Sequence, residues 1–124
     1  MTRTIRLFML VEAASFTAAS LVHSGVWITS YEHAQASLAE GVIAAVLFAG
    51  LGFSLVRQDW TRPVGLAAQG FALLGTLVGL FTIAIGVGPR TVPDLAYHAL
   101  IVVVLVWGLI VAARAGSPIT GRRI

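Results

Sequence analysis

Four long apolar stretches, separated by short polar segments, dominate the hydrophobic pattern of this chain. They cover residues 5–29, 34–56, 64–87 and 92–113. Each is long enough to form a helix across the hydrocarbon core of a bilayer, which takes about 20 residues. The connecting segments are too short to fold alone, so consecutive helices are expected to be antiparallel neighbours. The pattern predicts an all-α, integral membrane four-helix bundle with up-down topology, forming one domain over residues 1–124.

Composition agrees with a membrane protein and restricts its chemistry. Hydrophobic residues make up 58% of the chain and charged residues 10%, against about 45–50% apolar and about 25% charged residues in soluble domains. The lipid bilayer is therefore the expected partner, and no nucleic-acid partner is expected. The chain has no cysteine and no lysine, so c-type haem attachment, thiolate clusters and retinal-type Schiff bases are excluded. No covalent cofactor is predicted.

The distribution of arginines predicts an orientation. Arg90 falls on one side of the predicted bundle, and the other seven arginines fall on the opposite side. These seven are Arg3, Arg6, Arg57, Arg62, Arg114, Arg122 and Arg123. Because basic residues are enriched in cytoplasmic segments, both termini are expected in the cytoplasm, in a bacterial-type inner (plasma) membrane. Glu12 interrupts the first apolar stretch, which favours a mature helix over a cleaved signal peptide.

Three ionisable residues in three different helices share one predicted depth. His23, Glu40 and His98 each lie about six residues, or roughly 9 Å, inside the outer end of their helix. Charged groups are costly in hydrocarbon and often mark functional sites. Two imidazoles and one carboxylate suit iron, zinc or copper, so the pattern predicts an outward-facing polar cavity that binds a transition metal ion or small cofactor. The predicted supporting residues are His33, Asp94, Arg90 and Tyr97.

The same residues allow other interpretations. His23 and His98 could be the axial ligands of a b-type haem, with Arg90 pairing a propionate, but Glu40 would then be an awkward neighbour. Alternatively, the three residues form a hydrogen-bonded network that only stabilises the bundle. Asp94 follows Pro93, so it could simply complement the positive end of the fourth helix. Glu32 and His33 are expected in a solvated turn.

A second polar level is predicted in the inner half of the bundle. Glu12 lies about 10 Å from the cytoplasmic boundary, at a depth similar to that of Ser54 and Gln69. A buried carboxyl there is expected to be protonated and to donate a hydrogen bond. Alternatively, Glu12 and Glu40 are stations on a proton path.

The third apolar stretch contains no acidic, basic or histidine residue. Gly75 and Gly79 have the small-xxx-small spacing that lets membrane helices approach closely. This spacing predicts helix packing, either within the bundle or across the interface of a homo-oligomer.

Two known families of four-span proteins are similar in size. A glutamate in the first helix resembles the small multidrug resistance transporters, and the chain length is similar to that of the small fluoride channels. Both families imply dual-topology dimers with nearly balanced basic residues, and the bias seen here opposes this. The segment 10–15, Leu-Val-Glu-Ala-Ala-Ser, also departs from the transporter motif. Both resemblances are rejected.

A closer resemblance covers roughly the second half of the chain. It includes Gln69-Gly-Phe-Ala-Leu-Leu-Gly-Thr-Leu-Val-Gly, Gly86-Val-Gly-Pro-Arg-Thr-Val-Pro-Asp and Tyr97-His98. These segments are similar to those of small four-span bacterial membrane proteins with no assigned activity. The resemblance implies the four-span architecture and adds no catalytic residue.

The leading hypothesis is an outward cavity that binds a metal ion or small cofactor for electron transfer, sensing or metal handling. One alternative is an oligomeric proton-coupled transporter or channel, which requires a polar path to the cytoplasm. The other is an accessory or structural subunit of a larger membrane complex. No hydrolase or transferase signature is present, so the sequence leaves open whether the protein is an enzyme.

Overall fold

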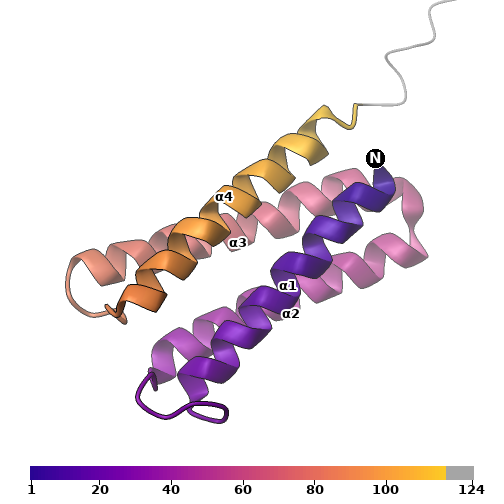
Figure 1. Ribbon diagram of the computed structural model, residues 1–124. Coiled ribbons are helices and arrows are strands. Elements are labelled where there is room, and N and C mark those ends of the chain that lie inside the picture. Colours follow the sequence, from indigo (N-terminus) through magenta and orange to yellow (C-terminus); the bar gives the residue numbers. More distant parts are fainter. Residues whose placement is uncertain (117–124) are drawn as a thin grey trace, which may run out of the picture.

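The computed structural model describes residues 1–116, and this part of the chain folds into four long helices. They are α1 (Thr2–Ser24), α2 (Ala34–Val56), α3 (Thr61–Ala84) and α4 (Val92–Arg114), with a short 3₁₀ helix, η1 (Gln58–Trp60), before α3. In Figure 1 consecutive helices lie side by side, and the N-terminus and the end of α4 lie at the same end of the bundle. Arg122 and Arg123, used above for the orientation, lie outside the described residues.

Two helices end earlier than the hydrophobic pattern predicts. α1 ends at Ser24 instead of residue 29, because Gly25 adopts a left-handed conformation with φ of 80°. α3 ends at Ala84 instead of residue 87, and Gly86 follows with φ of 88°. At both ends the apolar residues beyond the glycine belong to the loop, so hydrophobicity alone overestimated the helix length.

α3 also begins earlier than predicted, at Thr61 instead of residue 64. Pro63 lies in its first turn, where a missing N–H costs nothing because the first backbone N–H groups of a helix have no partner within it. The bounds of α2 are those predicted. α4 begins at the predicted residue and ends one residue later, at Arg114.

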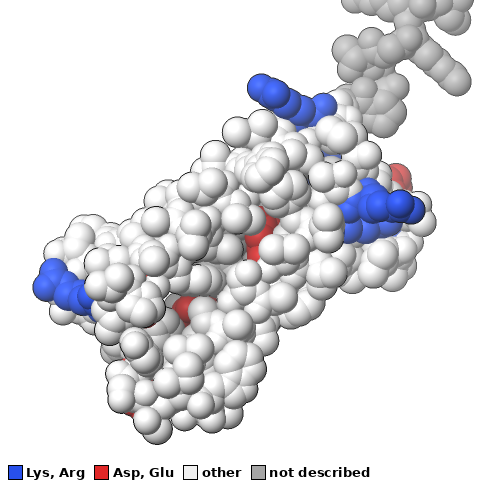
Figure 2. Space-filling model, in the orientation of Figure 1, with Lys and Arg blue, Asp and Glu red and all other residues white. Residues whose placement is uncertain are grey.

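All four helices are long and apolar enough to cross a membrane. Large apolar side chains are exposed along them; examples are Leu38 at 71%, Leu74 at 63% and Leu100 at 68% exposed. Figure 2 shows the basic residues at the two ends of the bundle, and between them a mostly uncharged surface in which acidic atoms are visible only in small recessed areas. A lipid environment accounts for this surface, which would be unfavourable in water.

The third helix uses its glycines for packing within the chain. A Cβ atom at Gly75 would lie 2.8 Å from Cδ1 of Ile43 on α2, and one at Gly79 would lie 3.3 Å from Nε2 of His98 on α4. Both glycines therefore face neighbouring helices, as the small-xxx-small spacing allows. Whether α3 also forms a homo-oligomer interface stays a prediction.

Candidate functional site

Three ionisable side chains from three helices meet in one half of the bundle. Nδ1 of His23 (α1) lies 2.5 Å from Oε1 of Glu40 (α2), and Nε2 of His23 lies 2.8 Å from Oδ1 of Asp94 (α4). The exposed fractions are 4%, 6% and 7% for His23, Glu40 and Asp94. We call these three residues the triad. A buried imidazole bonded at both nitrogens to carboxylates is a charged network that is screened from solvent.

The start of α4 fixes the position of Asp94. Its Oδ2 accepts hydrogen bonds from the backbone N–H of Thr91, at 3.1 Å, and from the Thr91 hydroxyl. The Thr91 hydroxyl in turn accepts from the backbone N–H of Asp94, which completes a capping box. The predicted role of Asp94 at the positive end of the helix is therefore present, and its second oxygen also contacts His23.

The α1–α2 loop brings His23 and Glu40 together although α1 is shorter than predicted. His23 is the second-last residue of α1, not six residues inside it. The backbone N–H of His33 donates to the carbonyl oxygen of His23 at 2.8 Å, which folds the loop back against α1. His33 then caps α2, because its Nδ1 accepts from the backbone N–H of Ala36 at 3.1 Å.

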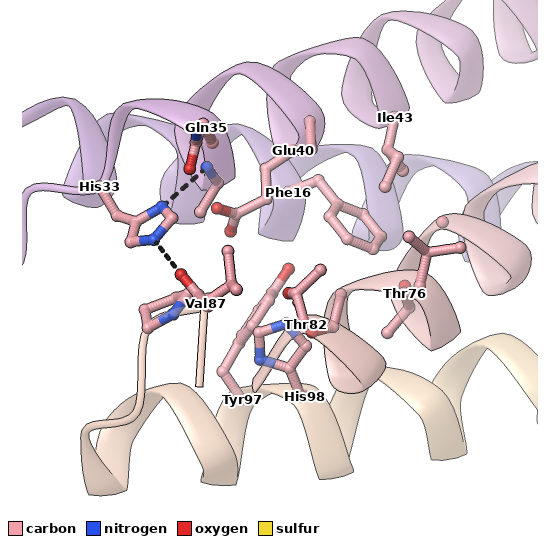
Figure 3. Close-up of a pocket in the computed structure, with 17 residues that line it drawn as sticks. Phe16, His33, Gln35, Glu40, Ile43, Thr76, Thr82, Val87, Tyr97 and His98 are labelled. Atoms are coloured by element: carbon pink, nitrogen blue, oxygen red, sulfur yellow. Dashed lines mark hydrogen bonds between the residues drawn. The ribbon is translucent and has the colours of Figure 1, made fainter. Parts of the chain in front are cut away.

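A cavity of about 160 Å³ lies beside the triad, between α2, α3 and α4. Figure 3 shows the Glu40 carboxyl and the Tyr97 hydroxyl pointing into this space, with His98 on the same side. Oε2 of Glu40 and the Tyr97 hydroxyl are buried and have no hydrogen-bond partner among the described residues. Most of the remaining lining is apolar, and it includes Phe16 and Ile43. The cavity is thus an apolar chamber with a few polar groups aimed into it.

The hydrogen bonds of two histidines determine which ring nitrogen carries a proton. Nδ1 of His98 lies 2.7 Å from the carbonyl oxygen of Asp94, so it must donate, and the neutral ring has an acceptor at Nε2. In His33 the roles of the two nitrogens are exchanged. Its Nδ1 accepts from the backbone N–H of Ala36, and its Nε2 donates to the carbonyl oxygen of Val87 at 3.1 Å. In the cavity, Glu40 Oε2 is therefore an acceptor, and His98 Nε2 is a second acceptor in the neutral form of the ring.

A wider groove of about 520 Å³ lies on the other side of the triad, between α1 and α4. Small side chains of α1, including Ala18 and Ala19, form part of its wall, and His23 and Asp94 also line it. Tyr97 lines both the groove and the cavity. The triad and Tyr97 therefore separate two hollows in the same half of the bundle.

The geometry does not support the predicted metal centre of His23, Glu40 and His98. Among the described residues, no three His, Cys, Asp or Glu side chains are placed to hold a metal ion. The physical reason is that both ring nitrogens of His23 already contact carboxylates. The same contacts oppose the haem alternative, because Nε2 of His23 cannot be an axial ligand while it is bonded to Asp94.

Two other predicted residues lie apart from the triad. Arg90 does not contact its carboxylates: the guanidinium donates from Nε to the carbonyl oxygen of Ile83 at 2.9 Å and from Nη2 to that of Ala84 at 3.3 Å. It therefore satisfies carbonyls at the end of α3. His33 is half-buried and bonded at both nitrogens, and its ring centroid lies 6.5 Å from that of His23. It joins the α1–α2 loop to the α3–α4 loop.

The inner polar level differs from its prediction. Glu12 and Gln69 are fully buried, but neither Glu12 oxygen has a hydrogen-bond partner among the described residues. The Gln69 amide instead donates to the carbonyl oxygens of Gly65 and Gly108, at 3.1 and 3.5 Å. Ser54 is bonded to Arg6 and to Leu51. The predicted hydrogen bond from Glu12 is therefore not found within residues 1–116.

Sequence reasoning missed several residues of the site. Thr91 was not singled out, although Thr91-Val-Pro-Asp94 has the spacing of a capping box and could have revealed it. The cavity wall formed by Phe16, Thr76 and Thr82 was also missed. These residues carry no signal in a single sequence, because ordinary core side chains look the same.

Comparison of this chain with protein-family models, with curated proteins and with solved structures gives no match.

Proposed function

We propose that this chain is an integral membrane protein that binds a small ligand in the cavity beside the triad. In this proposal it lies in the inner (plasma) membrane of a bacterium with up-down topology and both termini in the cytoplasm. Among the described residues, Arg3, Arg6, Arg57, Arg62 and Arg114 occupy one end of the bundle, against Arg90 at the other. The positive-inside rule then directs the cavity end outward.

The observation that carries the proposal is the buried, unpartnered oxygen of Glu40. Buried polar groups nearly always have hydrogen-bond partners, and leaving one without a partner costs about 1–3 kcal/mol. Glu40 Oε2 and the Tyr97 hydroxyl both lack a partner in the described chain, and both belong to residues that line the cavity. Apolar chambers with a few convergent polar groups are typical ligand sites. A ligand that bonds to these atoms would satisfy them.

The buried residues between the two polar levels favour binding over transport. Going along each helix from the level of Glu12 to that of Glu40, the fully buried side chains are mainly apolar; they include Phe16, Leu47, Ala72 and Leu105. Thr76 is a buried exception, but its hydroxyl donates to the Ala72 carbonyl of its own helix. No hydrogen-bonded chain links Glu12 to Glu40 in the described residues. This layer argues against a proton path through a single bundle.

The binding test uses three small probes that differ in charge. Purified protein in nanodiscs is titrated with ethanol, acetate and ethylammonium, and saturable binding is followed by ligand-observed NMR. The expected result is saturable binding of at least one probe, lost in Ala36→Phe, which fills the cavity from α2. Ala34→Phe is the matched control, because Ala34 is exposed and does not line the cavity. Failure of all three probes to bind would overturn the proposal.

Access to the cavity can be tested separately because the chain has no cysteine of its own. Thr82→Cys places a thiol on the cavity wall, and Ala72→Cys places one in the apolar layer. A membrane-impermeant methanethiosulfonate reagent added from the extracytoplasmic side is expected to label the first and not the second. Labelling of Thr82→Cys from the cytoplasmic side alone would reverse the proposed orientation.

A further inference from the structure

We infer that Glu40 Oε2 exchanges one proton for one small organic ammonium ion that carries N–H groups. This inference rests on the proposed function, since it names the ligand class of the same cavity. It follows from the number of protons that the triad must hold, from the donors around each carboxylate and from the shape of the cavity.

The first step is a proton count. Each of the two His23 contacts, at 2.5 and 2.8 Å, joins a ring nitrogen to a carboxylate oxygen. Two acceptor atoms repel at such distances, so each contact contains one proton. With these two protons, one imidazole and two carboxylates have a net charge of −1. A third proton, or a bound cation, makes the triad neutral.

The second step locates the remaining negative charge. Oδ2 of Asp94 already accepts from the N–H and the O–H of Thr91, so its charge is stabilised. Oε2 of Glu40 is buried and accepts no hydrogen bond from the described residues. Glu40 Oε2 is therefore the atom at which a third proton or a cation would be bound most favourably.

The groups around Glu40 supply no competing cation. His23 and Asp94 belong to the triad, and the His98 and His33 rings each donate one hydrogen bond to a backbone carbonyl oxygen, of Asp94 and of Val87. Tyr97 contributes its hydroxyl group to the cavity. The ionisable side chain of α3 is Arg62, which lies in its first turn and donates to the carbonyl oxygens of Ala112 and Ala113 at the other end of the bundle. The threonines of α3 at the cavity, Thr76 and Thr82, donate to carbonyls of their own helix. The guanidinium of Arg90 is held by carbonyls of α3.

The third step concerns the ligand. The cavity presents two acceptors, Glu40 Oε2 and His98 Nε2, and one hydroxyl, at Tyr97. An ammonium group donates up to three hydrogen bonds and has no acceptor, so it matches this set. The apolar lining and the volume of about 160 Å³ suit a short alkyl chain. The cation takes the position of the third proton, which leaves to solvent, and the charge of the site is unchanged.

Calorimetry tests the exchange with ethylammonium as the probe. Titrations of protein in nanodiscs at one pH, in buffers of different ionisation enthalpy, measure the protons released on binding. We expect release of about one proton per ethylammonium bound, and an affinity that falls as the pH falls. Ethanol, which is neutral, and tetramethylammonium, which has no N–H, are expected to bind about 10- to 100-fold more weakly.

Substitutions separate this inference from the proposed function. Glu40→Gln is expected to lower ethylammonium affinity about 10- to 100-fold and to abolish proton release, whereas Glu12→Gln, at the inner level, leaves both unchanged. Glu40→Asp keeps the charge, so a folded Glu40→Asp protein that releases a proton with weaker binding supports the assignment even if Glu40→Gln fails to fold. Ethanol or acetate binding without ethylammonium binding would overturn the ligand class and leave the proposed function standing. Ethylammonium binding without proton release, or unchanged in Glu40→Gln, would also refute the exchange.

Discussion

The bundle buries carboxyl groups in two regions, which differ in the hydrogen-bond partners that they give these groups. In the region next to the α3–α4 loop, called the outer region after the proposed orientation, Glu40 and Asp94 are joined through His23, and Asp94 is further bonded to Thr91. In the inner region Glu12 is fully buried, with no partner for either oxygen in the described residues. The outer carboxylates therefore belong to a network in which the loss of one side chain removes a hydrogen-bond partner of another. Glu12 is instead an isolated polar group in an apolar core.

Two glycines, one in each region, also differ in packing. A Cβ atom added at Gly108, in the inner region, would lie 2.0 Å from Oε1 of Gln69 and 3.0 Å from Cδ1 of Phe8. One added at Gly79, in the outer region, would meet only His98, at 3.3 Å. The outer region contains the cavity, whereas the inner glycine is in close contact with its neighbours. Three predictions test this comparison.

Removal of the shared imidazole should have the largest effect. In His23→Ala, Glu40 and Asp94 lose the cation between them, and breaking a buried ion pair at one partner costs about 3–5 kcal/mol. Thermal unfolding in detergent and SDS titration measure the loss. His33→Ala is the matched control, with an expected cost of about 1 kcal/mol from the lost helix cap. Equal losses in the two variants would mean that the triad is no more than a local contact.

The packing contrast should give an intermediate effect. Gly108→Ala forces the Gln69 amide and the Phe8 ring to move, and overpacking of this kind costs about 1–3 kcal/mol. Gly79→Ala needs a shift of a few tenths of an ångström by the His98 ring, so its cost should be below about 1 kcal/mol. The same unfolding measurements apply. A larger loss for Gly79→Ala than for Gly108→Ala would contradict the assignment of Gly108 as the more tightly packed of the two positions.

The smallest effect is expected at Glu12, with the opposite sign. Glu12→Met keeps the length of the side chain and removes two buried oxygens without partners, so a stabilisation of about 1 kcal/mol is expected. Glu12→Gln, which keeps polar atoms, should leave the unfolding midpoint nearly unchanged. Clear destabilisation by Glu12→Met would show that the carboxyl has a partner in the membrane-embedded protein, and the contrast with the outer region would fail.

The helices could be predicted because apolar stretches about 20 residues long have few alternatives in lipid. The sequence also indicated that His23, Glu40 and Asp94 lie toward one end. It did not indicate which atoms meet: His98 was predicted to share a ligand site with His23 and Glu40, yet its ring lies against Gly79, and Asp94 contacts His23 instead. Such pairings depend on the rotation of each helix and on loop geometry. Glu12 illustrates the same limit, since a shared depth with Gln69 does not place two side chains on facing surfaces.

The carboxylate of Asp94 belongs both to the chemistry of the site and to the architecture of α4. One oxygen contacts His23, and the other closes the first turn of the helix with Thr91. A change in charge at the imidazole therefore acts directly on the first turn of α4. The protonation of His23 and the hydrogen bonds that begin α4 are therefore coupled through a single side chain, Asp94.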